Sequence, residues 1–476
     1  MLELQWKSEA GSASNRVFLL DKVDPVWPDF LSEQEKAFAL QQWENKSTLI
    51  HLNRHPQHLF LVLAEQMDDE SKGLEQFRKL GNQCHGMWNK LALTEVSVTT
   101  SFFDSNYLLA FAEGVALSHY QFLKYFEKQA DKRFSLQQLV LVDARLSAAA
   151  VEELSNLVQA VFHARRLIDE PLSYLTAGKL AEEIIELSNQ AGFRAEVFDK
   201  ARIEQEGFGG LLAVNRGSID PPSFSVLEWK PENPMNSKPI VFVGKGIVYD
   251  TGGLSLKPTG NSMDYMKSDM SGAAAVIGLF YAAAKNNLPL HLIGLVPATD
   301  NRPGLNAYTP GDVIKMHSGL QVEVLNTDAE GRMILADALS YAKRYEPELV
   351  VDLATLTGAA VVAVGTEAIA AMRTAGDDAF YKLMKAGKHV YERLVEFPLW
   401  DEYGEQIKSE VADIKNVGGR DAGSITAGKF LEHFTAYPWI HLDIAGPAFL
   451  HKKDSYRGQG GVGVGTRLLY QFLKMY

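Results

Sequence analysis

Residues 239–257 read PIVFVGKGIVYDTGGLSLK, and this stretch indicates the class of the fold. It opens with a short continuous apolar run at 239–243, which is typical of a strand buried on both faces of a parallel sheet. Glycines and charged residues follow directly, among them Lys245, Asp250 and Lys257. In open α/β sheets, ligands bind beyond the carboxyl ends of the strands. The stretch therefore predicts a central strand with site-forming residues at its end.

The segments that follow this strand alternate between helical and extended patterns. Residues 271–285 form a helical pattern of small residues, and residues 330–345 carry apolar residues at helical spacing. Residues 290–297 and 348–352 are again short apolar runs that are typical of buried strands. This alternation indicates βαβ units and a mainly parallel central sheet flanked by helices.

The first part of the chain also has an α/β pattern. Its expected strands cover 58–65, 94–100 and 139–143, and its expected helix covers 106–128. A further helix is expected from about 147 to 169, and Glu170 and Pro171 end it. We therefore predict an α/β protein of two domains, a smaller N-terminal one at 1–150, whose role the sequence leaves open, and a catalytic one at 151–476.

The composition of the 476 residues excludes several classes of protein. The single cysteine, Cys84, excludes an intrachain disulfide and a cysteine-based zinc site. A formal net charge of −12 argues against nucleic-acid binding through overall charge. The longest stretches without a charged residue span about 14 residues, fewer than the roughly 18 that a membrane span needs. The N-terminus lacks the features of a signal peptide, so we expect a cytoplasmic protein that does not insert into membranes.

Four carboxylates mark the expected site. Asp250, Asp269 and Asp328 lie at expected strand ends or just before expected helices, and Glu330 opens a helix. Four carboxylates brought together cannot all stay ionised without cations, and a pair of divalent metals is the natural solution. Oxygen ligands favour Mg²⁺, Mn²⁺ or Zn²⁺, and none of the 12 histidines falls inside the cluster. Each fragment alone is more typical of a turn or a helix cap, so the prediction rests on their joint occurrence.

The same cluster carries a family resemblance. Residues 326–332 read NTDAEGR, which resembles the signature of the leucyl aminopeptidase (cytosol aminopeptidase) family. The blocks VGKGIVYDTGG, LSLKP and MKSDMSGAAAV are similar to the family's other metal-site blocks and stand in the same order. The resemblance covers about 155–470, whereas 1–150 matches no motif of the family. It implies a dinuclear metallopeptidase that removes N-terminal residues, leucine-like ones preferred, from peptides with a free N-terminus.

The resemblance also implies a set of metal ligands. Asp250 and Glu330 would bridge two divalent ions per subunit, Mn or Zn, with Mg and Co as alternatives. Asp328 would complete one site, with its backbone carbonyl as a further ligand. Asp269 and Lys245 would complete the other site, and the lysine would bind as the neutral amine because an ammonium has no lone pair.

Catalytic and substrate-binding residues follow from the same resemblance. Lys257 would polarise the scissile carbonyl, a hydroxide bridging the metals would attack it, and Arg332 would hold a bicarbonate that serves as general base. The side-chain pocket would be lined by Met266, Thr355, Gly358, Ala445 and Ala448, with Leu356 offering backbone groups. Core packing remains the alternative for Met266 and Ala448.

Three departures from the family pattern concern substrate preference. Residues 258–262 (PTGNS) carry an apparent insertion between the positions of Lys257 and Asp269. Ser271 stands where the family usually has glycine, and Pro447 where threonine is common. No implied ligand is lost. The family resemblance further implies a homohexamer.

Other interpretations of the sequence are weaker. Tyr249–Gly252 resembles an aspartic-protease motif, but that chemistry needs a second such aspartate, and no second D-T-G or D-S-G occurs. A DNA-binding or scaffold role would have to lie in 1–150, where basic residues are dispersed among acidic ones, so nucleic acid is not an expected partner.

Two further motif matches are rejected. Gly458–Gly463 matches a dinucleotide-binding motif, but there is no room for a βαβ unit, and we expect a loop there. His51 and His55 lack the glutamate of a zinc-protease helix, and a loop is expected.

Overall fold

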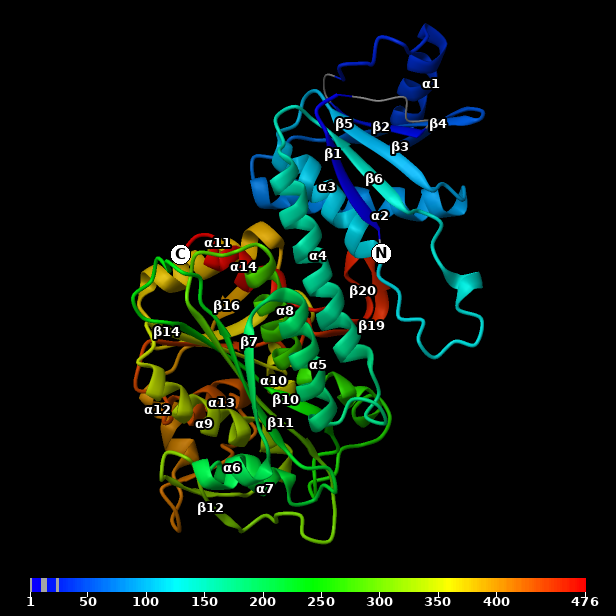
Figure 1. Ribbon diagram of the computed structural model, residues 1–476. Coiled ribbons are helices and arrows are strands. Elements are labelled where there is room, and N and C mark those ends of the chain that lie inside the picture. The colour runs from blue at the N-terminus through cyan, green and yellow to red at the C-terminus, as the bar shows by residue number, and fades with distance from the viewer. Residues whose placement is uncertain (1, 10–14, 23–24) are drawn as a thin grey trace. The chain divides into compact units, whose positions relative to one another are not determined.

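The computed structural model describes residues 2–9, 15–22 and 25–476 (Figure 1). The chain divides into two compact units, one of Met1–Gln159 with Lys452–Gly458 and one of Ala160–His451 with Gln459–Tyr476. The division falls inside helix α4 (Ala148–Asp169), which follows the expected helix closely. Within the described ranges, none of the helices has both the length and the apolar character needed to cross a membrane.

The first unit is built on a six-stranded sheet in the described residues, with the order β1-β6-β5-β2-β4-β3. Its strands are β1 (Glu3–Lys7), β2 (Asn15–Asp21), β3 (Leu49–Arg54), β4 (Gln57–Ala64), β5 (Glu95–Thr100) and β6 (Gln138–Val142). All neighbouring strands are parallel except β3 and β4. Its helices are α1 (Glu33–Glu44), α2 (Glu70–Lys90) and α3 (Ser105–Ser118), with a short 3-10 helix η1 (Ala130–Lys132).

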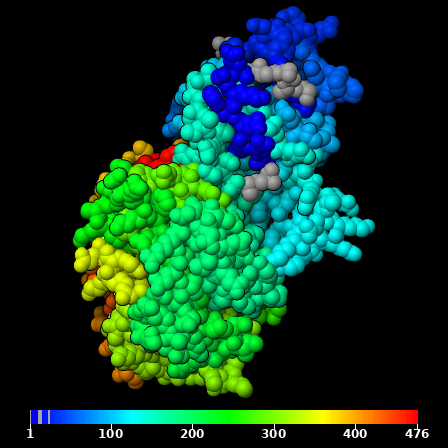
Figure 2. All heavy atoms as spheres, viewed as in Figure 1, coloured from blue at the N-terminus to red at the C-terminus, as the bar shows by residue number. Residues whose placement is uncertain are grey.

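Helix α3 is shorter than the sequence pattern predicts. It ends at Ser118, whereas helical spacing continues to residue 128. The side chain of Gln121 instead donates to the carbonyl of Lys132 and accepts from the amide of Phe134, and residues 119–128 form a loop. Figure 2 shows this segment in cyan as a protrusion from its unit. The expectation of a helix over 119–128 is therefore wrong.

The second unit contains a nine-stranded sheet in the described residues, with the order β16-β15-β18-β14-β9-β11-β8-β7 and with β10 beside β11. Its strands are β7 (Arg194–Phe198), β8 (Ser223–Trp229), β9 (Ile240–Gly244), β10 (Gly246–Asp250), β11 (Leu292–Asn301), β14 (Leu349–Ala354), β15 (Ile369–Arg373), β16 (Leu394–Glu396) and β18 (Trp439–Asp443). The central strands β18, β14, β9 and β11 run parallel, whereas β15 and β8 are antiparallel to their inner neighbours. The predicted mainly parallel α/β sheet is confirmed.

Helices and small sheets complete this unit. The helices are α5 (Ala177–Ala191), α6 (Lys200–Glu206), α7 (Gly209–Asn215), α8 (Ser271–Lys285), α9 (Glu330–Ala342), α10 (Gly358–Val364), α11 (Asp377–Val390), α12 (Asp401–Gly404), α13 (Gly423–Glu432) and α14 (Thr466–Leu473), with 3-10 helices η2 (Met263–Met270), η3 (Thr327–Ala329), η4 (Lys343–Tyr345) and η5 (Glu405–Ile407). The 3-10 helix η6 (Ser455–Arg457) belongs to the first unit. A small sheet joins β12 (Val313–Lys315), β13 (Gln321–Glu323) and β17 (Ile414–Lys415), and a pair joins β19 (Phe449–Asp454) and β20 (Gly458–Gly461).

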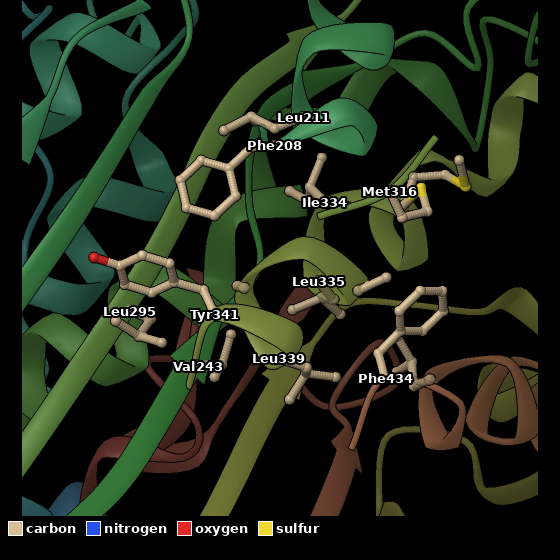
Figure 3. Packing of buried hydrophobic residues seen from close by; sticks show 14 of the residues in the cluster. Phe208, Leu211, Val243, Leu295, Met316, Ile334, Leu335, Leu339, Tyr341 and Phe434 are labelled. Carbon is tan, nitrogen blue, oxygen red and sulfur yellow. The ribbon is translucent and has the colours of Figure 1, made fainter. Parts of the chain in front are cut away.

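Helices α8 and α9 cover opposite faces of the central sheet. Gly294 of β11 faces α8, because a Cβ there would lie 2.8 Å from a ring carbon of Phe280. Its neighbour Leu295 belongs to the core cluster that contains Ile334 and Leu335 of α9. Successive strand residues point to opposite faces, so the two helices lie on different sides. Figure 3 shows the α9 side chains packed against the sheet.

Two stretches that were expected to be loops are strands. His51 lies in β3, where it pairs with Phe60 of β4. Residues Gly458–Gly461 form β20, although glycine weakens a strand, because they pair with β19. Strand β10 was not expected either, since it follows β9 after a single residue, Lys245.

Candidate functional site

Three carboxylates converge beyond the carboxyl ends of the central strands. Asp250 is the last residue of β10 and stands opposite Asn301, the last residue of β11. Asp328 lies in η3, and Glu330 is the first residue of α9. One carboxylate oxygen from each of Asp250, Asp328 and Glu330 lies within 4.8 Å of the others. The strand-end geometry that the sequence predicts therefore brings these residues together.

The two other residues implied as ligands adjoin this group. Lys245 links β9 to β10 and is only 2% exposed. Its Nζ lies 2.8 Å from Oδ1 of Asp269 and 3.0 Å from Oε1 of Glu330, and it donates to the carbonyl of Thr355 at 2.8 Å. Asp269 lies in η2, just before α8, and also accepts a hydrogen bond from the Thr355 hydroxyl. The structure thus places all five residues in one cluster.

Lys257 reaches the same cluster from a glycine turn. Its Nζ lies 2.9 Å from Oδ2 of Asp250 and is paired with Asp328. The turn begins at Gly252, which has a positive φ of 84°. A Cβ at Gly252 would lie 2.5 Å from the carbonyl oxygen of Ser255 and 2.9 Å from Oδ1 of Asp328, so no other residue fits without displacement. The turn therefore sets the direction in which Lys257 extends.

Burial and mutual repulsion shift the pKa values of the carboxylic acids. Burial and the neighbouring carboxylates raise the pKa of Asp250 and of Asp328, and burial raises that of Asp269 to about 7. Glu330 is the exception, because the attraction of Lys245 and Lys257 outweighs burial and lowers its pKa. Negative charge in this cluster is therefore costly unless cations share it.

The donors of the cluster fit divalent metal ions. Oδ2 of Asp269 is buried and finds no hydrogen-bond partner among the described residues. A buried carboxylate oxygen without a donor normally has a cation or a water as its partner. The converging oxygens of Asp250, Asp328 and Glu330 are hard ligands of the kind that Mn²⁺ and Mg²⁺ prefer. Burial lowers the pKa of Lys245, but the attraction of the neighbouring carboxylates outweighs burial and raises it overall. Its use as a neutral ligand would therefore require the opposing field of two dications.

Arg332 lies in the first turn of α9, and one end of its guanidinium is held by a hydrogen bond. Its Nη1 donates to the carbonyl of Asn416 at 2.7 Å, whereas its Nε is buried and has no partner among the described residues. Burial lowers the pKa of Arg332 to about 10. The side chain of Asn416 in turn binds the backbone of Asn326 and Leu325. Asn416 thus ties Arg332 to the loop that carries Asp328.

Three of the residues expected to form the substrate pocket lie on two loops that a carboxylate joins. Thr355 and Leu356 follow β14, and Ala445 follows β18. The carboxylate of Asp443 joins the two loops, because its Oδ1 accepts from the amides of Leu356 and Ala445. Its Oδ2 accepts from the hydroxyl of Thr357.

The other expected pocket residues differ in exposure. Met266 in η2 is half-buried, Gly358 at the start of α10 is exposed, and Ala448 is buried. That Met266, Gly358 and Ala448 face one pocket stays a prediction.

The segment 258–262, which carries the apparent insertion, is mostly exposed, and the amide of Met263 donates back to the carbonyl of Pro258.

Three polar residues of the site were missed in the sequence. Asn301, Asn416 and Asp443 support the cluster through hydrogen bonds, and each is almost fully buried. Asn301 could have been found, because it lies just past an expected strand, where ligand sites form. Asn416 lies in the stretch 413–427, which resembles the family without an assigned role.

Comparison with protein families and relatives gives a consistent result. Residues 162–470 match the family described as "Cytosol aminopeptidase family, catalytic domain". A probable cytosol aminopeptidase of Chlorobium phaeobacteroides is 47% identical over 467 residues, which cover 92% of each chain. One from Syntrophotalea carbinolica is 47% identical over 369 residues, which cover 76% of this chain and 74% of the relative.

Solved structures agree with these sequence matches. The bottromycin maturation enzyme BotP in complex with Mn is 29% identical, with a TM-score of 0.86 over 98% of this chain and 99% of that one. A mutant of tomato leucine aminopeptidase is 25% identical, with a TM-score of 0.88 over 100% of this chain and 97% of that one. With the family match over 162–470 and a relative that is 47% identical over nearly the whole length, the chain belongs to the cytosol aminopeptidase family and is an aminopeptidase, a hydrolase of peptides.

Proposed function

We propose that this aminopeptidase releases N-terminal residues, leucine-like ones preferred, by means of two divalent metal ions. The observation that carries the proposal is the convergence of Asp250, Asp328 and Glu330 within 4.8 Å, with Asp269 and Lys245 beside them. Asp250 and Glu330 would bridge the ions, Asp328 would complete one site, and Asp269 with Lys245 the other. The Mn-bound structure of BotP supports manganese as one of the metals, and zinc is the alternative.

The metals would supply chemistry that carboxylates alone cannot. When bound, they would ligate the free amine of the substrate, polarise the scissile carbonyl and provide the bridging hydroxide as nucleophile. Ligation of a free amine would account for exopeptidase selectivity, since an internal peptide bond has none.

The chain's own residues would orient and stabilise the reacting groups. Lys257 sits beside Asp250 and Asp328, where its ammonium can donate to the developing oxyanion. Arg332 would hold a bicarbonate as general base. The buried, unpartnered Nε of its planar guanidinium supports a small anion there. Thr355, Leu356, Gly358, Ala445, Ala448 and Met266 would form the pocket for the N-terminal side chain.

The remaining expectations concern the whole chain. We propose that 151–476 acts as the catalytic domain, that 1–150 has a separate role, and that the protein is a cytoplasmic homohexamer. The family match to 162–470 supports the first point, and the names of the relatives support the location.

The test is cleavage of leucine amide and of its N-acetylated analogue in the presence of Mn²⁺. We expect hydrolysis of the free amine substrate alone, because acetylation delocalises the nitrogen lone pair into a carbonyl group and so makes it a poor metal ligand. Equal cleavage of both compounds would contradict amine ligation. A panel of aminoacyl amides would then rank leucine-like side chains against the others.

A variant of one bridging residue tests the metal site directly. Glu330→Gln keeps the size of the side chain but removes its charge, so we expect loss of bound Mn²⁺ measured by elemental analysis. Glu183→Gln is the matched control, because Glu183 is a buried glutamate paired with Arg166 outside the site. Full Mn²⁺ content in the Glu330 variant would remove Glu330 from the ligand set.

A variant of Arg332 tests the proposed general-base site. Arg332→Ala should lower kcat by roughly 100-fold, the lower range for loss of general acid–base catalysis, and leave the Mn²⁺ content unchanged. Loss of metal with little change in kcat per bound metal would give Arg332 a structural role instead.

A further inference from the structure

The side chain of Asn301 contacts both carboxylates that are proposed to bridge the metals. Its Nδ2 lies 2.8 Å from Oδ1 of Asp250, 3.4 Å from Oε2 of Glu330 and 3.0 Å from the carbonyl of Thr327. Asn301 is only 1% exposed. One amide group thus links the end of β10, the start of η3 and the start of α9.

The orientation of this amide is fixed by its surroundings. All three contacts of the Nδ2 atom are hydrogen-bond acceptors. Rotating the amide by 180° would place its oxygen against those acceptors, which would be repulsive. The amide oxygen therefore points the other way, and it has no hydrogen-bond partner among the described residues. An asparagine held only for core packing would be expected to satisfy both of its ends.

The backbone around Asn301 is locked as well. Its carbonyl accepts from both the amide and the hydroxyl of Thr251, at 3.0 and 2.8 Å. Gly253 closes over the side chain, since a Cβ there would lie 2.8 Å from Oδ1 of Asn301. The amide group has little freedom to turn away from Asp250 and Glu330.

We propose that Asn301 is a positioning residue that holds the carboxylates of Asp250 and Glu330 in the orientation needed to bridge two metal ions, an inference that rests on the proposed function. An uncharged hydrogen-bond donor is suited to this position between two carboxylates. It can direct the lone pairs of two carboxylates toward the metals without adding a positive charge that would repel them or a further negative charge that would need compensation.

Mn²⁺ titration calorimetry of the full chain tests the proposal. We expect Asn301→Ala to weaken Mn²⁺ binding by about 10- to 100-fold, the usual effect of losing a partner of a metal ligand. Asn236→Ala is the matched control, because Asn236 is also buried and donates to two carbonyls, but lies in the loop before β9. A purely structural role would lower the melting temperature in both variants and leave Mn²⁺ affinity unchanged.

Asn301→Asp separates positioning from charge. This variant keeps the shape of the side chain, removes the donor and adds a carboxylate 2.8 Å from Asp250. Positioning predicts weaker Mn²⁺ binding in this variant too, whereas a simple charge effect predicts tighter binding. Affinity at or above the wild-type value in either Asn301 variant would overturn the proposal. If the wild type itself bound no Mn²⁺, the proposed function would fail rather than the role of Asn301.

Discussion

Gly331, the second residue of α9, has no room for a side chain. A Cβ there would overlap Cε of Lys245 and lie 2.6 Å from its Nζ. Lys245 passes directly over the start of the helix to reach Asp269 and Glu330. The absence of a side chain at Gly331 is therefore what lets Lys245, from the link between β9 and β10, lie among carboxylates from two other elements.

We expect Gly331→Ala to destabilise the protein and to reduce Mn²⁺ binding. Alanine is the better helix former by about 1 kcal/mol, so helix propensity alone predicts a more stable protein. Overpacking against Lys245 should reverse that sign and cost about 1–3 kcal/mol. Urea unfolding and Mn²⁺ titration would measure both effects.

Gly178→Ala in α5 is the control for this variant, because the nearest atom to a Cβ there is 3.9 Å away. It should show the helix propensity gain without the clash. A Gly331 variant that gained stability as Gly178→Ala does would mean that Lys245 can move aside.

At the scale of single residues, charged groups were easier to predict than their supports. Asp250, Asp269 and Lys257 stand out because charges are rare next to buried strands and glycines. Asn301 is marked only by its place past an expected strand, and Asn416 by nothing local, since the role of an asparagine depends on which distant groups the fold brings to it. Hydrogen bonds between residues 50 or more positions apart leave no local trace in the sequence.

At the scale of elements, the pairing of β14 with β18 places a buried histidine beside a buried aspartate. Nδ1 of His441 lies 2.6 Å from Oδ1 of Asp352, and both are fully buried. Burial lowers the pKa of His441, but the contact with Asp352 and the attraction of Asp443 outweigh burial and the repulsion of Arg332, so the pKa is raised overall. The charged pair therefore stabilises the folded state at pH values where His441 is protonated.

This pair predicts a pH-dependent contribution to stability. Its stabilisation is fully present below pH 6.5, the ordinary pKa of histidine, and is lost as the pH rises through the raised value. The difference in unfolding free energy between wild type and His441→Gln should therefore shrink between pH 6 and pH 9 in urea titrations. His163→Gln is the control, because burial lowers the pKa of His163 to about 4 and keeps it neutral over that range. A constant difference for His441→Gln would show that the histidine is neutral in the fold.

The elements themselves were predicted where a single pattern dominates. Helix α8 has the expected bounds because its small apolar residues are buried all round, between strands and other helices. Strand β10 and the end of α3 could not be predicted, since each depends on a partner elsewhere in the chain, β11 in one case and residues 132 and 134 in the other. Strand β20 is made of glycine and glutamine, and only its pairing with β19 makes it a strand.

For the whole molecule, the net charge of −12 is less informative about function than the positions of the individual charges. The carboxylates of the site are gathered between 250 and 330 and are balanced locally by Lys245 and Lys257.

Apolar residues on the surface are more informative about assembly. Val361 and Val362 of α10 are 40% and 89% exposed, in a helix that begins at the expected pocket residue Gly358.

Assembly is the property of the whole molecule that is most open to test. The family resemblance predicts six copies, so light scattering should give about six times the chain mass of 52.7 kDa. If α10 contacts another copy, Val362→Asp should produce smaller particles, because burying an unpaired carboxylate in a contact is unfavourable. Met235→Asp is the control, since Met235 is 76% exposed but precedes β9 at the opposite ends of the strands. A wild-type mass of one chain at all concentrations would contradict the hexamer, and an unchanged mass for Val362→Asp would place the contact away from α10.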